Sequence, residues 1–394
     1  MAARPPTRRR FLAALGSAAV GGLAGCSGPM PEPGTDRTTD WPMAHGTAGG
    51  RSYYGDAAVP RSEPQRRWDQ PVGSPAGRPT VADGRVFIPA IDALHAFDLK
   101  GGTARWTFRT GGNFWPTPPA IDDDLAFVGM QDEPVLLALD TADGTPRWDT
   151  PLEGAATVPP VLYPGDHRVF IGTDSGAVYC LARDTGEVRW RASTGVSNPA
   201  AICYRPPLLF VGTADGTVAG LAASDGGSAW SQSLDGGIRA MAVEDGDQLF
   251  VSTAPGTLAR LSGGGDLGER VWAREDGPVA HGSLVLTEDR LIVTDGSGVY
   301  SFGRDRGRPH WHLEGDYRVP PAGAGDTVLV GTDDRVEAYR LDGGLGLGDI
   351  RINANRWRTR VDGDVVGGLA VAGGTVVGLA QRASATTAFV LEPT

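Results

Sequence analysis

Cysteine and lysine are almost absent from this chain of 394 residues. It has three cysteines, Cys26, Cys180 and Cys203, and one lysine, Lys100, so every other basic residue is an arginine. Three cysteines, none of them adjacent, exclude a dense disulfide framework. The sequence also has no nucleophile elbow, phosphate-binding loop or zinc signature, which excludes the enzyme and metal sites that such motifs mark.

Basic charge is scarce as well. The formal net charge is −11, and residues 1–25 contain four of the arginines and no acidic residue. The rest of the chain has 47 acidic residues against 32 basic ones, a net charge of −15. Such a surface repels phosphate backbones, so we expect no nucleic-acid partner. An acidic composition with one lysine fits a GC-rich genome or a high-salt habitat, and the sequence leaves both open.

The apolar run near the N-terminus is too short to span a membrane. It lies within "TRRRFLAALGSAAVGGLAGC", residues 7–26, where a basic start precedes about a dozen small apolar residues, the pattern of a signal peptide. This predicts a signal peptide over residues 1–25. The stretch resembles a twin-arginine export signal. The residues that carry the resemblance are Arg8, Arg9, Phe11 and Leu12.

The tetrapeptide "LAGC" at the end of this run resembles a lipobox, in which Cys26 becomes the lipidated first residue. An ordinary cleavable signal with a chance cysteine is the alternative, but the two motifs coincide at matching spacing and favour lipidation. Residues 26–40 then form the lipidated cysteine and a disordered tether of proline, glycine and acid. We expect the remaining domain, residues 41–394, to be anchored by lipid on the extracytoplasmic side of a membrane.

Tryptophan recurs along the rest of the chain at intervals of 38 to 46 residues. Between successive tryptophans lie four short β-rich runs bounded by glycine and aspartate turns. A period near 40 with four strands predicts an all-β fold, an eight-bladed β-propeller of four-stranded antiparallel blades. The repeated residues are Trp68, Trp106, Trp148, Trp190, Trp230, Trp272, Trp311 and Trp357.

A glycine stands four residues ahead of most of these tryptophans. Glycine tolerates positive φ, so this position predicts a left-handed turn between the third and fourth strands. The tryptophan then lies on the outermost strand, where its ring can wedge between blades and serve blade docking. The glycines are Gly102, Gly144, Gly186, Gly226, Gly268 and Gly307, and the seventh unit has Asn353 instead.

Trp68 breaks this rule, because Pro64 precedes it by four and no strand comes before it. The chain also ends on what would be a third strand. The simplest closure is that residues 65–72 supply the outer strand of the last blade, 361–392. The third strands of most units have a small residue at the same position, which supports this alignment of the units. The small residues are Ala96, Ala138, Cys180, Gly220, Ser301 and Ala338, and the exceptions are Arg260 and Val390.

The stretches "DTGEVRW" and "VYCLARDTG" resemble pyrroloquinoline-quinone (PQQ) repeats, and the opener "WPMAHGTAGG" resembles the start of such domains. The resemblance covers residues 41–394 and implies the propeller. It leaves the chemistry open, because the family includes quinoprotein dehydrogenases with quinone and calcium as well as BamB-type lipoproteins, which scaffold other proteins without a cofactor.

The dehydrogenase alternative implies an adjacent cysteine pair, a tryptophan floor, Glu and Asn on calcium, and an Asp base. No cysteines are adjacent here. Cys180 stands in the small-residue position and Cys203 follows an apolar run, so both are expected in the core, with a disulfide between them left open. His310 and His312 flank Trp311 as metal ligands can, but a solvated outer strand is favoured.

Phe114 and Trp115, in "NFWP", are the candidate partner contact, in a loop between two blades. The alternative is that they pack beneath a neighbouring loop. We therefore expect no catalytic residue and no metal ligand. The function expected is a monomeric, lipid-anchored scaffold that binds a protein or another ligand, with no assigned cofactor. A PQQ-dependent dehydrogenase, with PQQ and calcium, is the alternative.

Overall fold

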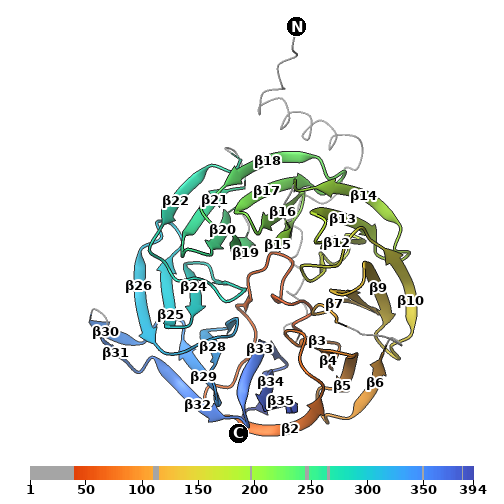
Figure 1. The fold of residues 1–394 in the computed structure, drawn as a ribbon. Helices are drawn as coiled ribbons and strands as arrows, with labels where there is room; N and C mark the ends of the chain where they lie inside the picture. Colours follow the sequence, from red (N-terminus) through yellow and green to blue (C-terminus); the bar gives the residue numbers. More distant parts are fainter. Residues whose placement is uncertain are drawn as a thin grey trace, which may run out of the picture.

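The computed structural model describes residues 40–109, 115–195, 198–244, 248–263, 267–347, 350–383 and 385–394. Within them the elements form eight sheets arranged in a ring about one axis, together with one small hairpin (Figure 1). The predicted eight-bladed propeller of four-stranded antiparallel blades is confirmed. Among the described residues, no helix has the length and apolar character needed to cross a membrane.

The first six blades each use four consecutive strands, from the axis outward. Blade one has β3 (Thr80–Ala82), β4 (Arg85–Ala90), β5 (Ala93–Asp98) and β6 (Ala104–Phe108). Blade two has β7 (Ala120–Asp122), β8 (Leu125–Gly129), β9 (Val135–Asp140) and β10 (Pro146–Pro151). Blade three has β11 (Val161–Leu162), β12 (Arg168–Gly172), β13 (Ala177–Ala182) and β14 (Val188–Ser193).

Blades four to six follow the same order. Blade four has β15 (Pro199–Arg205), β16 (Leu208–Thr213), β17 (Thr217–Ala222) and β18 (Ser228–Ser233). Blade five has β19 (Ile238–Glu244), β20 (Gln248–Thr253), β21 (Leu258–Ser262) and β22 (Arg270–Arg274). Blade six has β23 (Val285–Leu286), β24 (Arg290–Asp295), β25 (Gly298–Gly303) and β26 (Pro309–Glu314).

The last two blades depart from this scheme. Blade seven has β27 (Ala322–Ala324), β28 (Thr327–Gly331), β29 (Arg335–Arg340) and β32 (Asn355–Arg360), with β1 (Tyr53–Tyr54) parallel to β27 at the axis. The hairpin of β30 (Leu345–Leu347) and β31 (Ile350–Ile352) interrupts it. Blade eight has β33 (Asp364–Ala372), β34 (Thr375–Arg382) and β35 (Ala385–Glu392), completed by β2 (Gln65–Val72).

The ring closes in blade eight. Strand β2 pairs antiparallel with β35, so that Trp68 lies opposite Val390 and Gln65 opposite Glu392. The Arg67 side chain donates to Glu392 Oε2 at 2.5 Å across this pair. The predicted closure by residues 65–72 is confirmed, and it pairs what would otherwise be two free sheet edges.

The apolar pattern of each strand follows from its place in the blade. Middle strands such as β12 are buried almost throughout, because neighbouring blades cover both faces. Outermost strands such as β14 alternate between exposed and buried, because one face meets solvent. In blade three, Phe170, Cys180 and Trp190 lie side by side across three strands. The small residue therefore makes room for two aromatic rings.

Each repeated tryptophan from Trp68 to Trp311 packs on a glycine of the following blade. A Cβ built on Gly226 would lie 2.7 Å from Trp190 Cε3, and Trp190 Nε1 donates to the Ala223 carbonyl at 2.9 Å. The six predicted glycines have φ between 62° and 76°, as expected for left-handed turns. The glycine therefore serves two needs, a positive φ and a surface without Cβ for the indole.

The seventh unit confirms the predicted left-handed residue but adds an insertion. Asn353 has the predicted positive φ of 59° and follows the inserted hairpin, between the third and fourth strands of blade seven. Gly343, which precedes the hairpin, makes the contact with Trp311. Trp357 differs again, because its Nε1 donates at 2.7 Å to the carbonyl of Pro60, which belongs to the N-terminal segment. The sequence pattern did not reveal Gly343, because the inserted hairpin separates it from Trp357 by more than the usual four residues.

Candidate functional site

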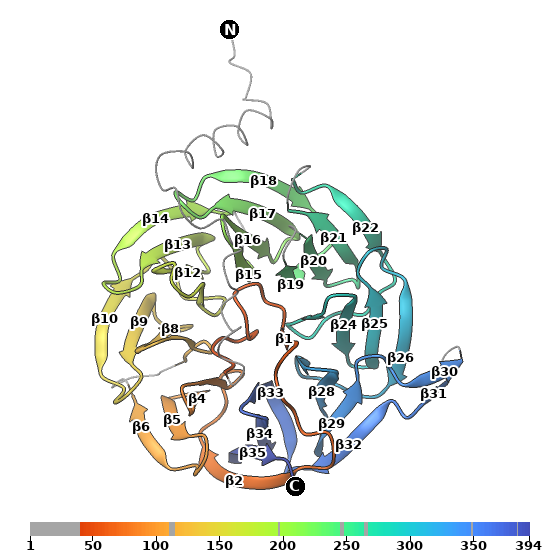
Figure 2. The ribbon, with the colours of Figure 1, turned by 180° about the vertical axis from the view of Figure 1, so that it is seen from behind.

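The axis of the ring is occupied by a segment of the chain itself, residues 41–54, which we call the belt. Figures 1 and 2 show it at the centre of the propeller, at the red end of the colour bar. The innermost strands of six blades each donate a backbone N–H to a belt carbonyl, at 2.7–3.0 Å. The donors are Val81, Ile121, Tyr204, Val243, Leu286 and Gly323. The belt carbonyls thus accept hydrogen bonds from N–H groups at the inner sheet edges, which would otherwise need water as a partner.

The belt lies very close to the strands that it contacts. A Cβ on Gly49 would lie 2.5 Å from the Val243 carbonyl oxygen, and one on Gly50 would lie 2.8 Å from both Cys203 Sγ and the Met241 carbonyl. Gly50 also has a φ of 71°. Gly49 and Gly50 of the opener are therefore needed for close backbone approach.

Arg78 fastens the belt to the ring. Its side chain is 3% exposed, and Nη1 donates to the Ala44 carbonyl at 2.8 Å and to Ser52 Oγ at 3.3 Å. Nη2 donates to the carbonyls of Pro320 and Pro321, both at 2.9 Å. These acceptors are uncharged oxygens from the belt and from the entry to blade seven. Arg78 therefore joins the belt, blade one and blade seven by hydrogen bonds.

His45, within the belt, is neutral in the folded protein. Burial, and then the nearby charge of Arg78, lower its pKa from the usual 6.5 to about 3. Next to it, between the belt and the start of blades three and four, lies a recess of about 30 Å³. This recess is lined by residues such as Met43, Val158 and Ile202, and it has room for about one water molecule rather than for a fused-ring quinone.

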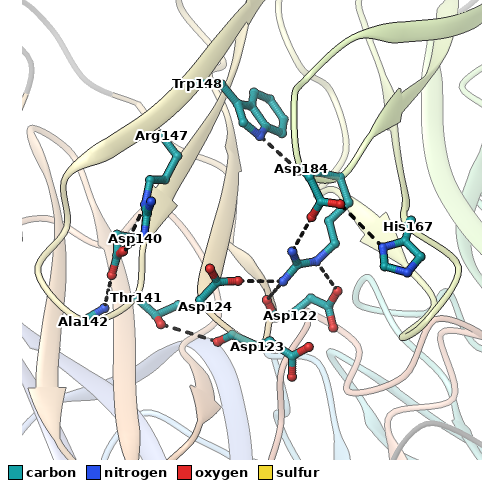
Figure 3. A network of polar contacts seen from close by, with 11 residues as sticks. Asp122, Asp123, Asp124, Asp140, Thr141, Ala142, Arg147, Trp148, His167 and Asp184 are labelled. Atoms are coloured by element: carbon teal, nitrogen blue, oxygen red, sulfur yellow. Dashed lines mark hydrogen bonds and ion pairs between the residues drawn. The ribbon is translucent and has the colours of Figure 1, made fainter.

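A polar cluster joins blades two and three near the turns at their edges (Figure 3). The Arg183 guanidinium donates to Asp122 Oδ2 at 2.6 Å, to Asp124 Oδ1 at 2.9 Å and to Asp184 Oδ1 at 2.6 Å. Burial works against the charge of Arg183, but these carboxylates outweigh it and raise its pKa above the usual value. The Arg183 carbonyl also accepts from Trp148 Nε1, so the cluster reinforces blade docking.

A second buried cluster lines an open recess of about 330 Å³ at blade seven. Glu337 is 6% exposed, and it accepts from the hydroxyls of Tyr317, at 3.2 Å, and Tyr339. Arg358 Nε lies 3.3 Å from the same carboxylate. Burial raises the pKa of both tyrosines. The carboxylate is thus engaged within the protein, which suits a structural group better than a free general base.

The predicted site residues do not converge on one place. The lipidation residue Cys26, the export residues Arg8, Arg9, Phe11 and Leu12, and Phe114 lie outside the described residues. The eight tryptophans are spread around the ring, one on each outermost strand. Trp115 is 47% exposed, while its backbone N–H bonds to Asp132 Oδ1 at 3.3 Å and its carbonyl accepts from Gln131 N at 2.9 Å. Its loop is therefore held while its ring faces solvent.

The two described cysteines are free thiols in the core. Burial raises the pKa of Cys180 and that of Cys203 to about 12, so neither is a reactive thiolate near neutral pH. The disulfide that the sequence left open is not formed. Cys203 Sγ instead donates to the Met241 carbonyl at 3.2 Å.

The two histidines of β26 have different surroundings. The ring of His312 stacks on Tyr300 at 4.5 Å, whereas His310 is exposed. Over the described part of the chain, no three His, Cys, Asp or Glu side chains form a group that could hold a metal ion.

The ring of eight blades, closed by β2 and filled by the belt, defines a closed β-propeller. Residues 92–165 and 159–345 match the family model described as outer membrane protein assembly factor BamB. The match covers more than half of the chain, and the chain therefore belongs to this family of PQQ-type repeat propellers.

Solved structures agree on the fold. BamB from Moraxella catarrhalis is 20% identical, with a TM-score of 0.65 over 84% of this chain and 98% of that one. A quinohemoprotein alcohol dehydrogenase from Pseudomonas putida HK5 is 12% identical, with a TM-score of 0.75 over 91% and 80%. At such identities the likeness extends to the fold alone.

One curated relative matches over a shorter stretch. The serine/threonine-protein kinase AfsK of Streptomyces griseus is 29% identical over 126 residues, which are 29% of this chain and 15% of the kinase. The shared part is thus a small fraction of that protein.

Proposed function

We propose that this protein is a non-catalytic, extracytoplasmic scaffold, anchored by lipid at Cys26, that binds a partner protein through the outside of the ring. One observation carries the proposal. The belt fills the axis with the chain's own backbone, whereas the large apolar side chains that are exposed among the described residues lie on loops and outer strands. They are Trp115, Val188, Val271, Leu345 and Ile352. Trp115 carries the most weight among them, because aromatic rings are enriched at interaction surfaces, whereas single exposed aliphatic residues are ordinary.

Family membership supports the same conclusion, because the matching model is described as an assembly factor rather than as an oxidoreductase. Assembly of outer membrane proteins belongs to the proteins so described, and for this chain we propose only the scaffold role. The signal and "LAGC" motif support an extracytoplasmic position for it.

Two measurements test the proposal. The mature protein, purified and titrated with PQQ and calcium, should show no quinone absorbance that survives gel filtration. A stoichiometric quinone spectrum with dye reduction by an alcohol would overturn the scaffold role. Separately, Cys26→Ser should release the protein from the membrane fraction if lipid is its only anchor. Retention with normal signal cleavage would instead show that a membrane partner holds the propeller.

A further inference from the structure

Blade seven departs from the other blades at two residues of its third strand, β29. Glu337 and Tyr339 flank Ala338, which pairs with Trp357, so their side chains share the opposite face of the sheet. In the other seven blades the residue equivalent to Tyr339 is leucine or phenylalanine, and no equivalent of Glu337 is a carboxylate. The equivalents of Glu337 are His95, Leu137, Tyr179, Ala219, Ala259, Tyr300 and Phe389.

The fold itself does not need polar groups at these two positions. Blade two has Leu137 and Leu139 there, both buried, and its third and fourth strands pair with a register shift at the same place as in blade seven. Burying a carboxylate costs free energy that burying leucine does not. A buried polar pair where the repeat uses apolar residues therefore indicates a role other than folding.

The recess of about 330 Å³ at blade seven has a surplus of negative charge. It lies where β26 ends and where β28 meets β29, and Figure 1 shows these strands in blade seven and its neighbour. Asp316 is paired with Arg318 at 2.5 Å and Asp334 with Arg335 at 2.6 Å, whereas Glu314 and Asp333 form no ion pair with any described residue. The lining carboxylates are Glu314, Asp316, Asp333, Asp334 and Glu337, and the lining arginines are Arg335 and Arg358.

Glu337 is held rigidly at this recess. Its Oε2 accepts from the hydroxyls of Tyr317 and Tyr339, which fixes the carboxylate. Its Oε1 lies 3.3 Å from Nε of Arg358, whose side chain is 54% exposed. A guanidinium of the chain itself thus already approaches this carboxylate from the solvent side, and two further carboxylates of the recess are left without a cation.

The shape and charge of the recess select its ligand. Over the described residues no three acidic, cysteine or histidine side chains converge as a metal ion requires, so the fitting cation is organic. Sites for free small molecules are mostly apolar and enclose their ligand, whereas this recess is polar and open. A second copy of this chain, with a net charge of −11, would bring like charges together. A basic side chain on a different protein meets these requirements.

We propose that the recess at blade seven binds an arginine or lysine side chain of the partner protein, with Glu337, Glu314 and Asp333 as its acceptors. This rests on the proposed scaffold function and names the chemistry by which the partner is recognised. The guanidinium or ammonium group would lie against the carboxylates, and the rest of the partner would cover the open side of the recess.

The test uses a labelled, end-blocked peptide with one central arginine, and the same peptide with citrulline, which has a similar shape without the charge. The purified mature protein at low salt should bind only the arginine peptide. Glu337→Gln keeps an acceptor for the tyrosine hydroxyls and should weaken binding about tenfold. Asp333→Asn, at the exposed rim, should weaken it about two- to fivefold and decides the test if the first variant does not fold. Glu133→Gln removes the same charge outside the recess and should leave binding unchanged.

A further variant separates binding from folding. Glu337→Leu, Tyr339→Leu and Tyr317→Phe together give blade seven the apolar pair of blade two and leave no tyrosine hydroxyl without its partner. This protein should melt at a temperature no lower than that of the unchanged protein, and it should not bind the arginine peptide. A large fall in the melting temperature would show that the cluster is required for the structure and would overturn the proposal.

Other outcomes overturn it as well. Equal binding of the arginine and citrulline peptides, or equal losses in Glu337→Gln and Glu133→Gln, would show that the recess does not recognise a cation. Agmatine that binds more tightly than the peptide would assign the site to a free organic cation, and calcium that does so would assign it to a metal. Failure of peptide binding alone refutes only this proposal, whereas a bound quinone in the separate titration would refute the scaffold function.

Discussion

The outer edge of this ring is repetitive, and its centre is not. Seven times around the outside, a tryptophan packs on a glycine of the next blade, mostly with the same indole hydrogen bond. At the centre, one belt of non-repeating sequence accepts backbone hydrogen bonds from six of the blades and is held by Arg78. Repeated contacts therefore set the packing of neighbouring blades, while a single segment joins six of the blades at the axis. The two kinds of contact can be broken separately.

Removing the belt and the closing strand together should have the largest effect. A protein that begins after residue 72 loses β2 and every belt hydrogen bond, which exposes sheet edges at the axis and in blade eight. We expect it to unfold or aggregate, measured by gel filtration and thermal unfolding. Deletion of residues 27–39 alone, which stops short of the buried Asp40, should leave the melting temperature nearly unchanged. A monomeric, cooperatively melting product of the longer deletion would contradict the closure.

Trp190→Ala tests one outer contact. The side chain is 8% exposed, and its loss removes both the packing on Gly226 and the bond to Ala223, so we expect a loss of about 3–5 kcal/mol in the free energy of unfolding. Trp115→Ala, at a half-exposed ring, should cost far less in the same denaturant titration. Equal losses would show that Trp115 belongs to the core.

Arg78→Met tests the centre. The change leaves the oxygens of Ala44, Ser52, Pro320 and Pro321 without this donor, so we expect a loss of about 2–3 kcal/mol by chemical denaturation. Hydrogen exchange of the belt-bonded amides, such as that of Val243, should rise more than that of amides in β12. Uniform exchange across the ring would argue against a specific role of Arg78 in fastening the belt.

Gly226→Ala tests whether the indole contact, as well as the turn, requires a glycine at the outer edge. Both Gly226 and Gly84 have positive φ, 73° and 70°, but a Cβ on Gly84 would meet no atom within 4 Å. Gly84→Ala should therefore show strain alone, about 1 kcal/mol, and Gly226→Ala should cost about 1–3 kcal/mol more because the new methyl group meets Trp190. Similar losses at both positions would mean that the turn conformation, rather than the indole, requires glycine.

The effect of pH is small near neutrality and grows as the pH falls. His45 has a pKa of about 3 in the folded protein and near 6.5 when unfolded, so the unfolded chain binds more protons between these values. Stability should therefore fall as the pH is lowered from 6.5 toward 4. In His45→Gln this part of the decrease should be lost, as seen by comparing melting temperatures of the two proteins across that range. Parallel curves would refute the assignment to His45.

The same contrast explains what the sequence could predict. The outer contacts use the same residues in each blade, so they recur in the sequence about every 40 residues. The blade number, the turn glycines and the closure by residues 65–72 could therefore be predicted from the spacing. The belt contacts occur once each and leave no period, and Arg78 looks like any other arginine between a glycine and a proline. The Gly343 contact was missed because the hairpin insertion displaces it. The partner surface has no repeat to mark it, and its exposure became visible only in three dimensions.

Closure by β2 also constrains the order in which the chain can fold during synthesis. The last blade needs residues 65–72 and 385–392 at once, and the belt must find strands as far apart as Val81 and Gly323. Residues 65–72 leave the ribosome long before residues 385–392, so blade eight can be completed only after the later segment has emerged. Contacts of such long sequence separation slow folding, because loop closure precedes any gain from pairing. Until these two segments pair, β2 and β35 each present a free sheet edge, and such edges favour aggregation of incompletely folded chains.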